Sequence, residues 1–114
     1  MSIAKLKVGI VGLGQVGQLY DLDKKREGIW THFSEYEYLS SQYDLISVCD
    51  IDDDKINLAL KRKPSLKVYR DFETMIANEQ LDVVSICTPP EQHGKQICFL
   101  AGKVKAIICE KPLD

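Results

Sequence analysis

Short apolar runs alternate with amphipathic stretches along this chain of 114 residues. The runs are rich in valine and isoleucine and lack the polar alternation of a strand with one face in water. Such runs predict strands that are buried on both faces of a sheet. The predicted strands cover 7–11, 45–49, 67–69, 82–87 and 106–109.

The stretches between these strands predict helices with recognisable first residues. One helix spans about 53–63, with Asp53 or Asp54 as its N-cap and Pro64 after its end. A shorter helix follows a cap at Asp71. Its apolar residues are Phe72, Met75 and Ile76.

A third helix begins at Pro90 or Glu91 and ends at Gly102. Its expected apolar face consists of Ile97, Leu100 and Ala101. Alternating strands and helices indicate βαβ units and a parallel sheet. Right-handed crossovers then favour a doubly wound, mostly parallel α/β sheet of the Rossmann type, with strand order 3-2-1-4-5-6. We expect the chain to stop after the fifth strand of that order.

One interval is too long for this plan. Gly14 and Asp50 are 36 positions apart, whereas about 20 residues normally separate the glycines of a Rossmann fold from the acidic residue after the second strand. We interpret 18–31 as an inserted loop, followed by a helix over 31–42 that Thr31 caps. The apolar stripe of that helix is Phe33, Tyr36 and Leu39, and we expect these side chains to serve packing. We expect His32 to be a packing or surface residue.

A glycine-rich turn connects the first strand to the segment after it. Residues 12–17 read Gly-Leu-Gly-Gln-Val-Gly, a GxGxxG pattern preceded by a buried strand. Gly12 permits a tight turn, Gly14 lets the backbone approach a pyrophosphate, and Gly17 permits close packing of helix against strand. Gln15 and Val16 then lie at a helix N-terminus that attracts phosphate. The alternative is a tight turn that binds no ligand.

Asp50 closes the second strand, where an acidic side chain can bond both hydroxyls of an adenosine ribose. It repels a 2′-phosphate, and no arginine follows directly, since Ile51 and three aspartates come next. The sequence therefore favours NAD as the cofactor, with NADP less favoured, and places Asp50 and Ile51 beside it. The alternative is that Asp50 is a helix cap or a solvated loop acid.

Two unusual segments follow the fourth and fifth strands: Thr-Pro-Pro-Glu-Gln-His at 88–93 and Glu-Lys-Pro at 110–112. Together with 9–17 and 48–52, they give the chain a clear resemblance to the N-terminal half of the Gfo/Idh/MocA oxidoreductases, named after glucose–fructose oxidoreductase and inositol dehydrogenase. The order and spacing of these motifs fit along essentially the whole chain. The insert before Thr31 departs from the family pattern.

The resemblance implies a role for each matching residue. Lys111 would face nicotinamide and substrate and would polarise the reacting hydroxyl, which makes it the candidate catalytic residue. The other positions implied to line the cofactor site are Thr88, Pro89, His93, Glu110 and Pro112. From the residues alone, Lys111 could equally be a surface charge, and His93 a helix-cap or surface residue.

Composition narrows the choice of partners. Fifteen basic and seventeen acidic residues give a net charge of −2, which argues against a nucleic-acid partner. No apolar run approaches the roughly 18 residues of a membrane helix, so no membrane partner is expected. Four cysteines without zinc or CxxC spacing predict buried, reduced thiols, no metal site and a cytoplasmic location. They are Cys49, Cys87, Cys98 and Cys109. The alternatives are a catalytic thiol or a disulfide.

The resemblance implies that 1–114 is the NAD(P)-binding part of a two-domain enzyme whose substrate domain lies outside this chain. The whole enzyme would transfer hydride between NAD(P) and a secondary alcohol of a sugar, cyclitol or related small molecule, and this part alone would be inactive. The alternative is a non-catalytic sensor or regulator that binds the dinucleotide. An open edge at the fifth strand, or an adjacent apolar face, would favour a homodimer.

Overall fold

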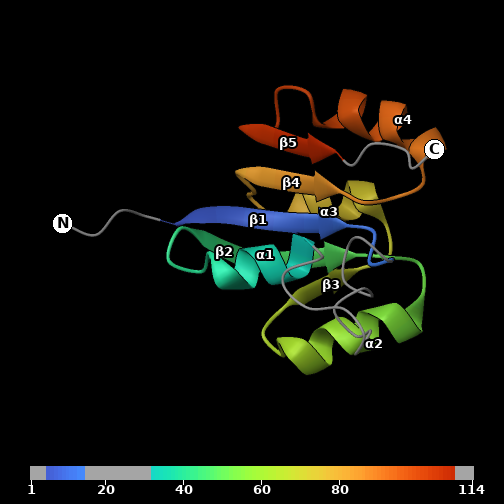
Figure 1. The fold of residues 1–114 in the computed structure, drawn as a ribbon. Helices are drawn as coiled ribbons and strands as arrows, with labels where there is room; N and C mark the ends of the chain where they lie inside the picture. Colours follow the sequence, from blue (N-terminus) through green and yellow to red (C-terminus); the bar gives the residue numbers. More distant parts are fainter. Residues whose placement is uncertain (1–4, 15–31, 110–114) are drawn as a thin grey trace.

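The computed structural model describes residues 5–14 and 32–109 (Figure 1). All five strands predicted from the apolar runs are present, each within two residues of its expected ends. In chain order the elements are β1 (Leu6–Val11), α1 (His32–Tyr38), β2 (Tyr43–Cys49), α2 (Asp53–Arg62), β3 (Lys67–Tyr69), α3 (Phe72–Asn78), β4 (Val83–Ile86), α4 (Pro90–Leu100) and β5 (Ala106–Cys109).

The strands form one parallel sheet with the order β3-β2-β1-β4-β5. All five arrows in Figure 1 point the same way. The order reverses direction at β1, because the chain moves outward to β2 and β3 and then returns to β4 beside β1. This is the doubly wound α/β arrangement of the Rossmann fold, as the sequence predicts.

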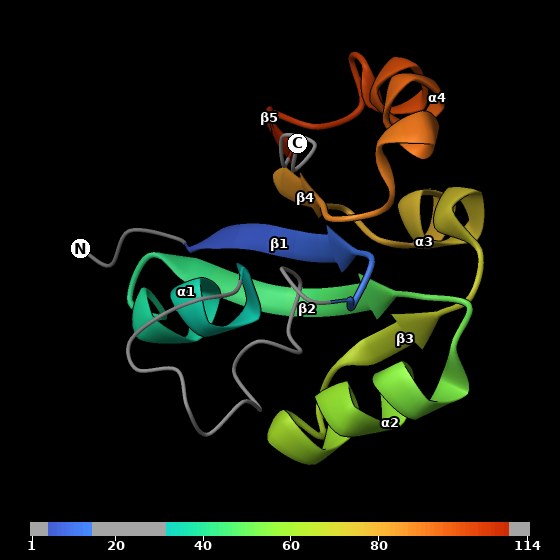
Figure 2. The same ribbon diagram turned by 45° about the vertical axis from the view of Figure 1, so that its right-hand side comes forward.

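Helices cover both faces of the sheet and create two cores (Figure 2). On one face, Tyr36 of α1 and Ile56 of α2 pack with Val8, Ile10 and inward side chains of β2 and β4. On the other face, Met75 of α3 and Leu100 of α4 pack with Val11 and the remaining side chains of β4. Because β1 and β4 contribute to both cores, their sequences are mostly apolar, with Lys7 near the start of β1 and a buried Ser85 in β4.

The register aligns the carboxyl ends of the strands in one row. Val11 pairs with Cys49 and with Ile86, while Cys49 pairs with Tyr69 and Ile86 with Cys109. The residues that follow these strands therefore emerge along a single edge of the sheet. Ligands of open α/β sheets bind at this edge, near the point where the strand order reverses.

Two predicted helix starts have different outcomes. Asp71 caps α3 as predicted, since its side chain accepts a hydrogen bond from the backbone N–H of Thr74. The prediction for α2 is wrong by one residue, because its N-cap is Asp52, whose side chain accepts from the N–H of Asp54. Three consecutive aspartates offer three possible caps, and only Asp52 has the extended backbone that a cap requires.

The predicted helix over 31–42 is shorter in the structure. The helix α1 ends at Tyr38, and Leu39 carries a turn that leads directly into β2 through hydrogen bonds to Gln42 and Tyr43. His32 and Tyr36 are buried, so both serve packing as expected, and Tyr36 bonds the hydroxyl of Ser85. The inserted loop at 18–31 lies outside the described residues, and so does Thr31, the predicted cap of this helix.

Three predictions of burial are wrong, and geometry explains two of them. The strands β3 and β5 are largely exposed because each has a neighbour on one side only within the described sheet. On α4, Ile97 and Ala101 face solvent, and Gln96 takes the inward position instead. The helix is rotated so that polar Gln96 meets a polar partner at the sheet edge.

The third concerns the cysteines, all of which lie in the described ranges and none of which forms a disulfide. Cys49 is buried as predicted, Cys87 and Cys109 are half-buried, and Cys98 is exposed on α4. Across the described part of the chain, no helix is both long and apolar enough to cross a bilayer.

Candidate functional site

Gly12 makes the first turn after β1 and can be nothing but glycine. Its φ of +94° lies in the left-handed region. A Cβ at this position would stand 2.8–2.9 Å from backbone atoms of Cys87 and Thr88. The N–H of Gly12 donates to the carbonyl of Cys49 at 2.8 Å. The glycine turn is therefore pressed against the loops that leave β2 and β4, as the predicted tight turn requires.

Gly14 has a different environment. A Cβ built on it would meet no atom of the described chain within 4 Å. Protein packing therefore gives no reason for glycine here, whereas close approach of a ligand to the backbone does. Gly14 follows β1, at the carboxyl edge of the sheet. Gln15, Val16 and Gly17 lie outside the described residues.

Asp50 connects the glycine turn to the end of β2. Its Oδ2 accepts a hydrogen bond from the N–H of Leu13 at 2.8 Å, and its Oδ1 accepts from the N–H of Asp52 at 2.9 Å. Each carboxylate oxygen has a second lone pair, so two further donors can be accommodated. A diol is one such pair of donors, and the position of Asp50 suits the ribose role that the sequence predicts.

An arginine that the sequence argument overlooked lies beside this acid. The N–H of Asp50 donates to the carbonyl of Tyr69 at the end of β3, and Arg70 follows directly. The Arg70 guanidinium pairs with Asp53 in the first turn of α2. This ion pair offsets the positive charge that would otherwise favour a 2′-phosphate. Arg70 comes close to the end of β2 because β3 pairs with β2. Only the strand order could have indicated this proximity from the sequence.

The remaining residues of this corner differ in character. Ile51 is 84% exposed next to Asp50, so it presents an apolar surface to solvent. The thiol of Cys49, just before Asp50, is buried, and burial raises its pKa to about 12, assisted by the charges of Asp50 and Asp71. Cys49 is therefore a neutral thiol at physiological pH and is unsuited to act as a nucleophile.

A chain of polar contacts joins the ends of β4 and β5. His93, in the first turn of α4, has its Nε2 2.6 Å from the carbonyl oxygen of Thr88. Its Nδ1 lies 3.1 Å from the Sγ of Cys109, the last residue of β5. The Thr88 hydroxyl donates to the Oε1 of Gln96 at 2.6 Å. The structure thus brings the predicted Thr88 and His93 together at the carboxyl edge.

Two members of this chain were not anticipated. Gln96 is only 8% exposed, and Cys109 was expected merely to be buried. The spacing of His93, Gln96 and Leu100 at i, i+3 and i+7 is the signal that could have identified the inward face of α4. Pro89 is exposed at the N-cap of that helix. Glu110, Lys111 and Pro112 lie outside the described residues.

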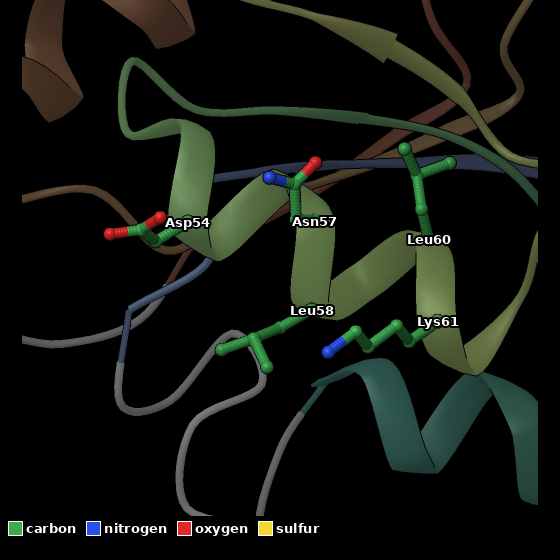
Figure 3. Close-up of a pocket in the computed structure, with 5 residues that line it drawn as sticks. All are labelled: Asp54, Asn57, Leu58, Leu60 and Lys61. Atoms are coloured by element: carbon green, nitrogen blue, oxygen red, sulfur yellow. The ribbon is translucent and has the colours of Figure 1, made fainter.

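One hollow of the described surface lies away from this edge. It lies along one side of α2 and has a volume of about 590 Å³ (Figure 3). None of the predicted site residues lines it. Its lining residues are Asp54, Asn57, Leu58, Leu60 and Lys61.

Comparison with known proteins agrees with the geometry of the carboxyl edge. The family model described as "Oxidoreductase family, NAD-binding Rossmann fold" matches residues 6–114, nearly the whole chain. The chain belongs to the Gfo/Idh/MocA oxidoreductase family. The glycine turn, Asp50 and the loop after β4 of this Gfo/Idh/MocA domain are thus parts of an NAD-binding Rossmann fold.

Similar proteins in this family are sugar and cyclitol dehydrogenases. An inositol 2-dehydrogenase of Salmonella paratyphi B is 29% identical over 109 residues, which cover 95% of this chain and 29% of that protein. The WlbA dehydrogenase of Chromobacterium violaceum, solved with NADH and UDP-GlcNAcA, matches with a TM-score of 0.78 at 24% identity over 98% of this chain and 29% of its own. A scyllo-inositol dehydrogenase of Lactobacillus casei, solved with NAD(H) and scyllo-inositol, matches with a TM-score of 0.73 at 24% identity over 97% of this chain and 30% of its own. The chain spans about 29% of the length of the curated relatives it matches.

Proposed function

We propose that this chain is the cofactor-binding part of an NAD-dependent dehydrogenase that oxidises a secondary alcohol of a sugar, a cyclitol or a related small molecule. The observation that carries the proposal is the pairing of Asp50 with the glycine turn. Its carboxylate accepts from the N–H of Leu13, one residue before Gly14 and its open space. A diol acceptor and a pyrophosphate cradle then lie next to each other, as an adenosine diphosphate requires.

NAD is favoured over NADP by the charges at this corner. A 2′-phosphate would have to approach the Asp50 carboxylate, and the nearby Arg70 is already paired with Asp53. Asp52 and Asp54 add further negative charge at the start of α2. Repulsion between like charges at this corner disfavours the phosphorylated cofactor.

The chain's own residues would bind and orient the reactants. The bound nicotinamide ring supplies the hydride acceptor. Thr88 and His93 would shape the wall beside the dinucleotide, because their contacts hold the loop after β4 against α4. Lys111 would donate a hydrogen bond to the reacting hydroxyl and favour its deprotonation. The second domain would supply the remaining acid–base chemistry.

The test is steady-state turnover of the full-length protein with NAD on a panel of inositols and aldoses. For the best substrate, we expect Lys111→Ala to lower kcat by about 10²-fold or more, because a positioned proton-transfer group contributes 10²–10⁴-fold. The matched control is Lys61→Ala, a lysine on the exposed side of α2, which should leave kcat unchanged.

Two results would contradict the proposal. An unchanged kcat in Lys111→Ala would show that this lysine is not catalytic. Tight NAD binding by the full-length protein with no turnover on any polyol would favour the non-catalytic sensor instead.

A further inference from the structure

The contact between Cys109 and His93 resembles the nucleophile–base pair of a reactive thiol. The two atoms are 3.1 Å apart and come from different elements, the end of β5 and the first turn of α4. A third group orients the base, since the other ring nitrogen of His93 is 2.6 Å from the Thr88 carbonyl oxygen. Nucleophile, base and orienting group in this order are the geometric signature of an activated nucleophile.

The orienting contact decides which nitrogen carries the proton. A backbone carbonyl can only accept a hydrogen bond, so the Nε2 of His93 must be the donor. In the neutral ring, Nδ1 then has a lone pair directed at the Sγ of Cys109. The thiol proton can therefore pass to Nδ1, and the resulting imidazolium remains bonded to Thr88.

Two of the three other described cysteines, Cys49 and Cys98, offer a contrast. Cys49 is a buried neutral thiol with a pKa of about 12. Cys98 is exposed on α4, whereas Cys109 is only half-buried. If access alone determined reactivity, Cys98 would be modified first. If the imidazole determines it, Cys109 would be modified first, despite its lower exposure.

We propose that Cys109 is an oxidation site for hydroperoxides, with His93 as its proton acceptor. The thiol proton moves to Nδ1 of His93, and the thiolate attacks the hydroxyl oxygen of the hydroperoxide. An S–O bond forms while the O–O bond breaks, so the sulfur is oxidised to a sulfenic acid and the peroxide is reduced. The leaving oxygen takes the proton from His93 and departs as an alcohol, or as water when the oxidant is hydrogen peroxide.

The experiment exposes the full-length protein to hydrogen peroxide in the presence of dimedone, which traps sulfenic acids, and follows each cysteine by peptide mass spectrometry. In the wild type, we expect Cys109 to be labelled about tenfold faster than the more exposed Cys98, given the known effect of an adjacent imidazole on thiol reactivity. This comparison needs no variant and no cofactor, so its result is independent of whether the proposed dehydrogenase function holds.

The matched variant is His93→Gln, whose amide can still donate to the Thr88 carbonyl but cannot accept the thiol proton. We expect it to slow labelling of Cys109 at least about tenfold and to leave Cys98 unchanged, because proton transfer by a positioned base contributes at least this much. Labelling of Cys98 faster than Cys109 in the wild type would overturn the proposal. So would an unchanged rate at Cys109 in a folded His93→Gln protein.

Discussion

Gly12 and Gly14 are two residues apart, yet only Gly12 is required to be glycine by its backbone conformation and its neighbours. Gly12 has a left-handed backbone and no room for a Cβ. Gly14 has neither constraint among the described residues, and we expect close approach of a ligand to require glycine there. The motif predicts both positions from sequence, but it cannot separate a requirement of the fold from a requirement of binding.

This difference predicts that substitution of Gly12 lowers stability, whereas substitution of Gly14 weakens cofactor binding. Gly12→Ala should lower the free energy of unfolding by about 1–3 kcal/mol, the cost of a strained backbone conformation, with any steric clash adding to it. Gly14→Ala should change that free energy by less than about 0.5 kcal/mol, the usual range at positions with free space. It should instead weaken NAD binding about tenfold, or ~1.4 kcal/mol.

Urea denaturation and NAD titration of the two variants provide the measurement. Equal destabilisation by both substitutions would show that Gly14 is structural. Unchanged NAD affinity in Gly14→Ala would show that the pyrophosphate does not bind at this turn.

Among the elements, β1, β2 and β4 were predictable because each is a short, mostly apolar run without regular polar alternation, and each lies in the middle of the sheet. The exposure of β5 was not, because its sequence is as apolar as theirs. Ile108 is 43% exposed only because the described sheet has no strand beyond β5. The orientation of α4 was missed for a related reason. Gln96 looks like a surface residue until the loop after β4 brings the Thr88 hydroxyl to it.

The start of α2 gives a prediction at this scale. Asp52→Ala should lower the free energy of unfolding by about 1 kcal/mol, because it removes the acceptor for the N–H of Asp54. The control is Asp54→Ala, which removes only a charge near the helix start and should cost about 0.3 kcal/mol. Chemical denaturation of both variants distinguishes them, and a larger loss in Asp54→Ala would contradict the assigned cap.

The amino edge of the sheet gives a prediction about pH. Asp82 accepts from the N–H of Lys7 at 2.8 Å and lies 3.4 Å from the Lys105 ammonium, so it ties β1 to the start of β5. The Lys7 hydrogen bond is the main cause of its lowered pKa, with a smaller contribution from Lys105. A carboxyl with a lowered folded-state pKa stabilises the fold above its unfolded pKa of about 3.9 and loses that contribution as pH falls through the folded value.

Asp82→Asn should therefore flatten the decline of the unfolding free energy below about pH 4, where an unperturbed aspartate begins to protonate. The exposed Glu73, on α3, provides the control as Glu73→Gln. Thermal unfolding at stepped pH values measures both. An acid limb as steep in Asp82→Asn as in the wild type would contradict the prediction.

At the scale of the whole molecule, the order of strands followed from the alternation of elements and the handedness of their connections. That order also predicted the edge where Gly12, Asp50 and Thr88 meet. Two contacts could not be predicted from the pattern of apolar and polar residues. One is the Arg70–Asp53 pair, which depends on β3 lying beside β2. The other is the Cys109–His93 contact, which depends on how α4 folds back over β5.

We expect this edge of the sheet to bind NAD and Asp50 to reject the 2′-phosphate of NADP. Isothermal titration calorimetry of the full-length protein with each dinucleotide tests this expectation most directly, with Asp50→Asn as the variant that keeps an oxygen acceptor for Leu13 but removes the charge. We expect the wild type to bind NAD at least about tenfold more tightly than NADP, or ~1.4 kcal/mol, and Asp50→Asn to narrow this preference. NADP binding as tight as NAD in the wild type, or no binding of either dinucleotide, would contradict this expectation.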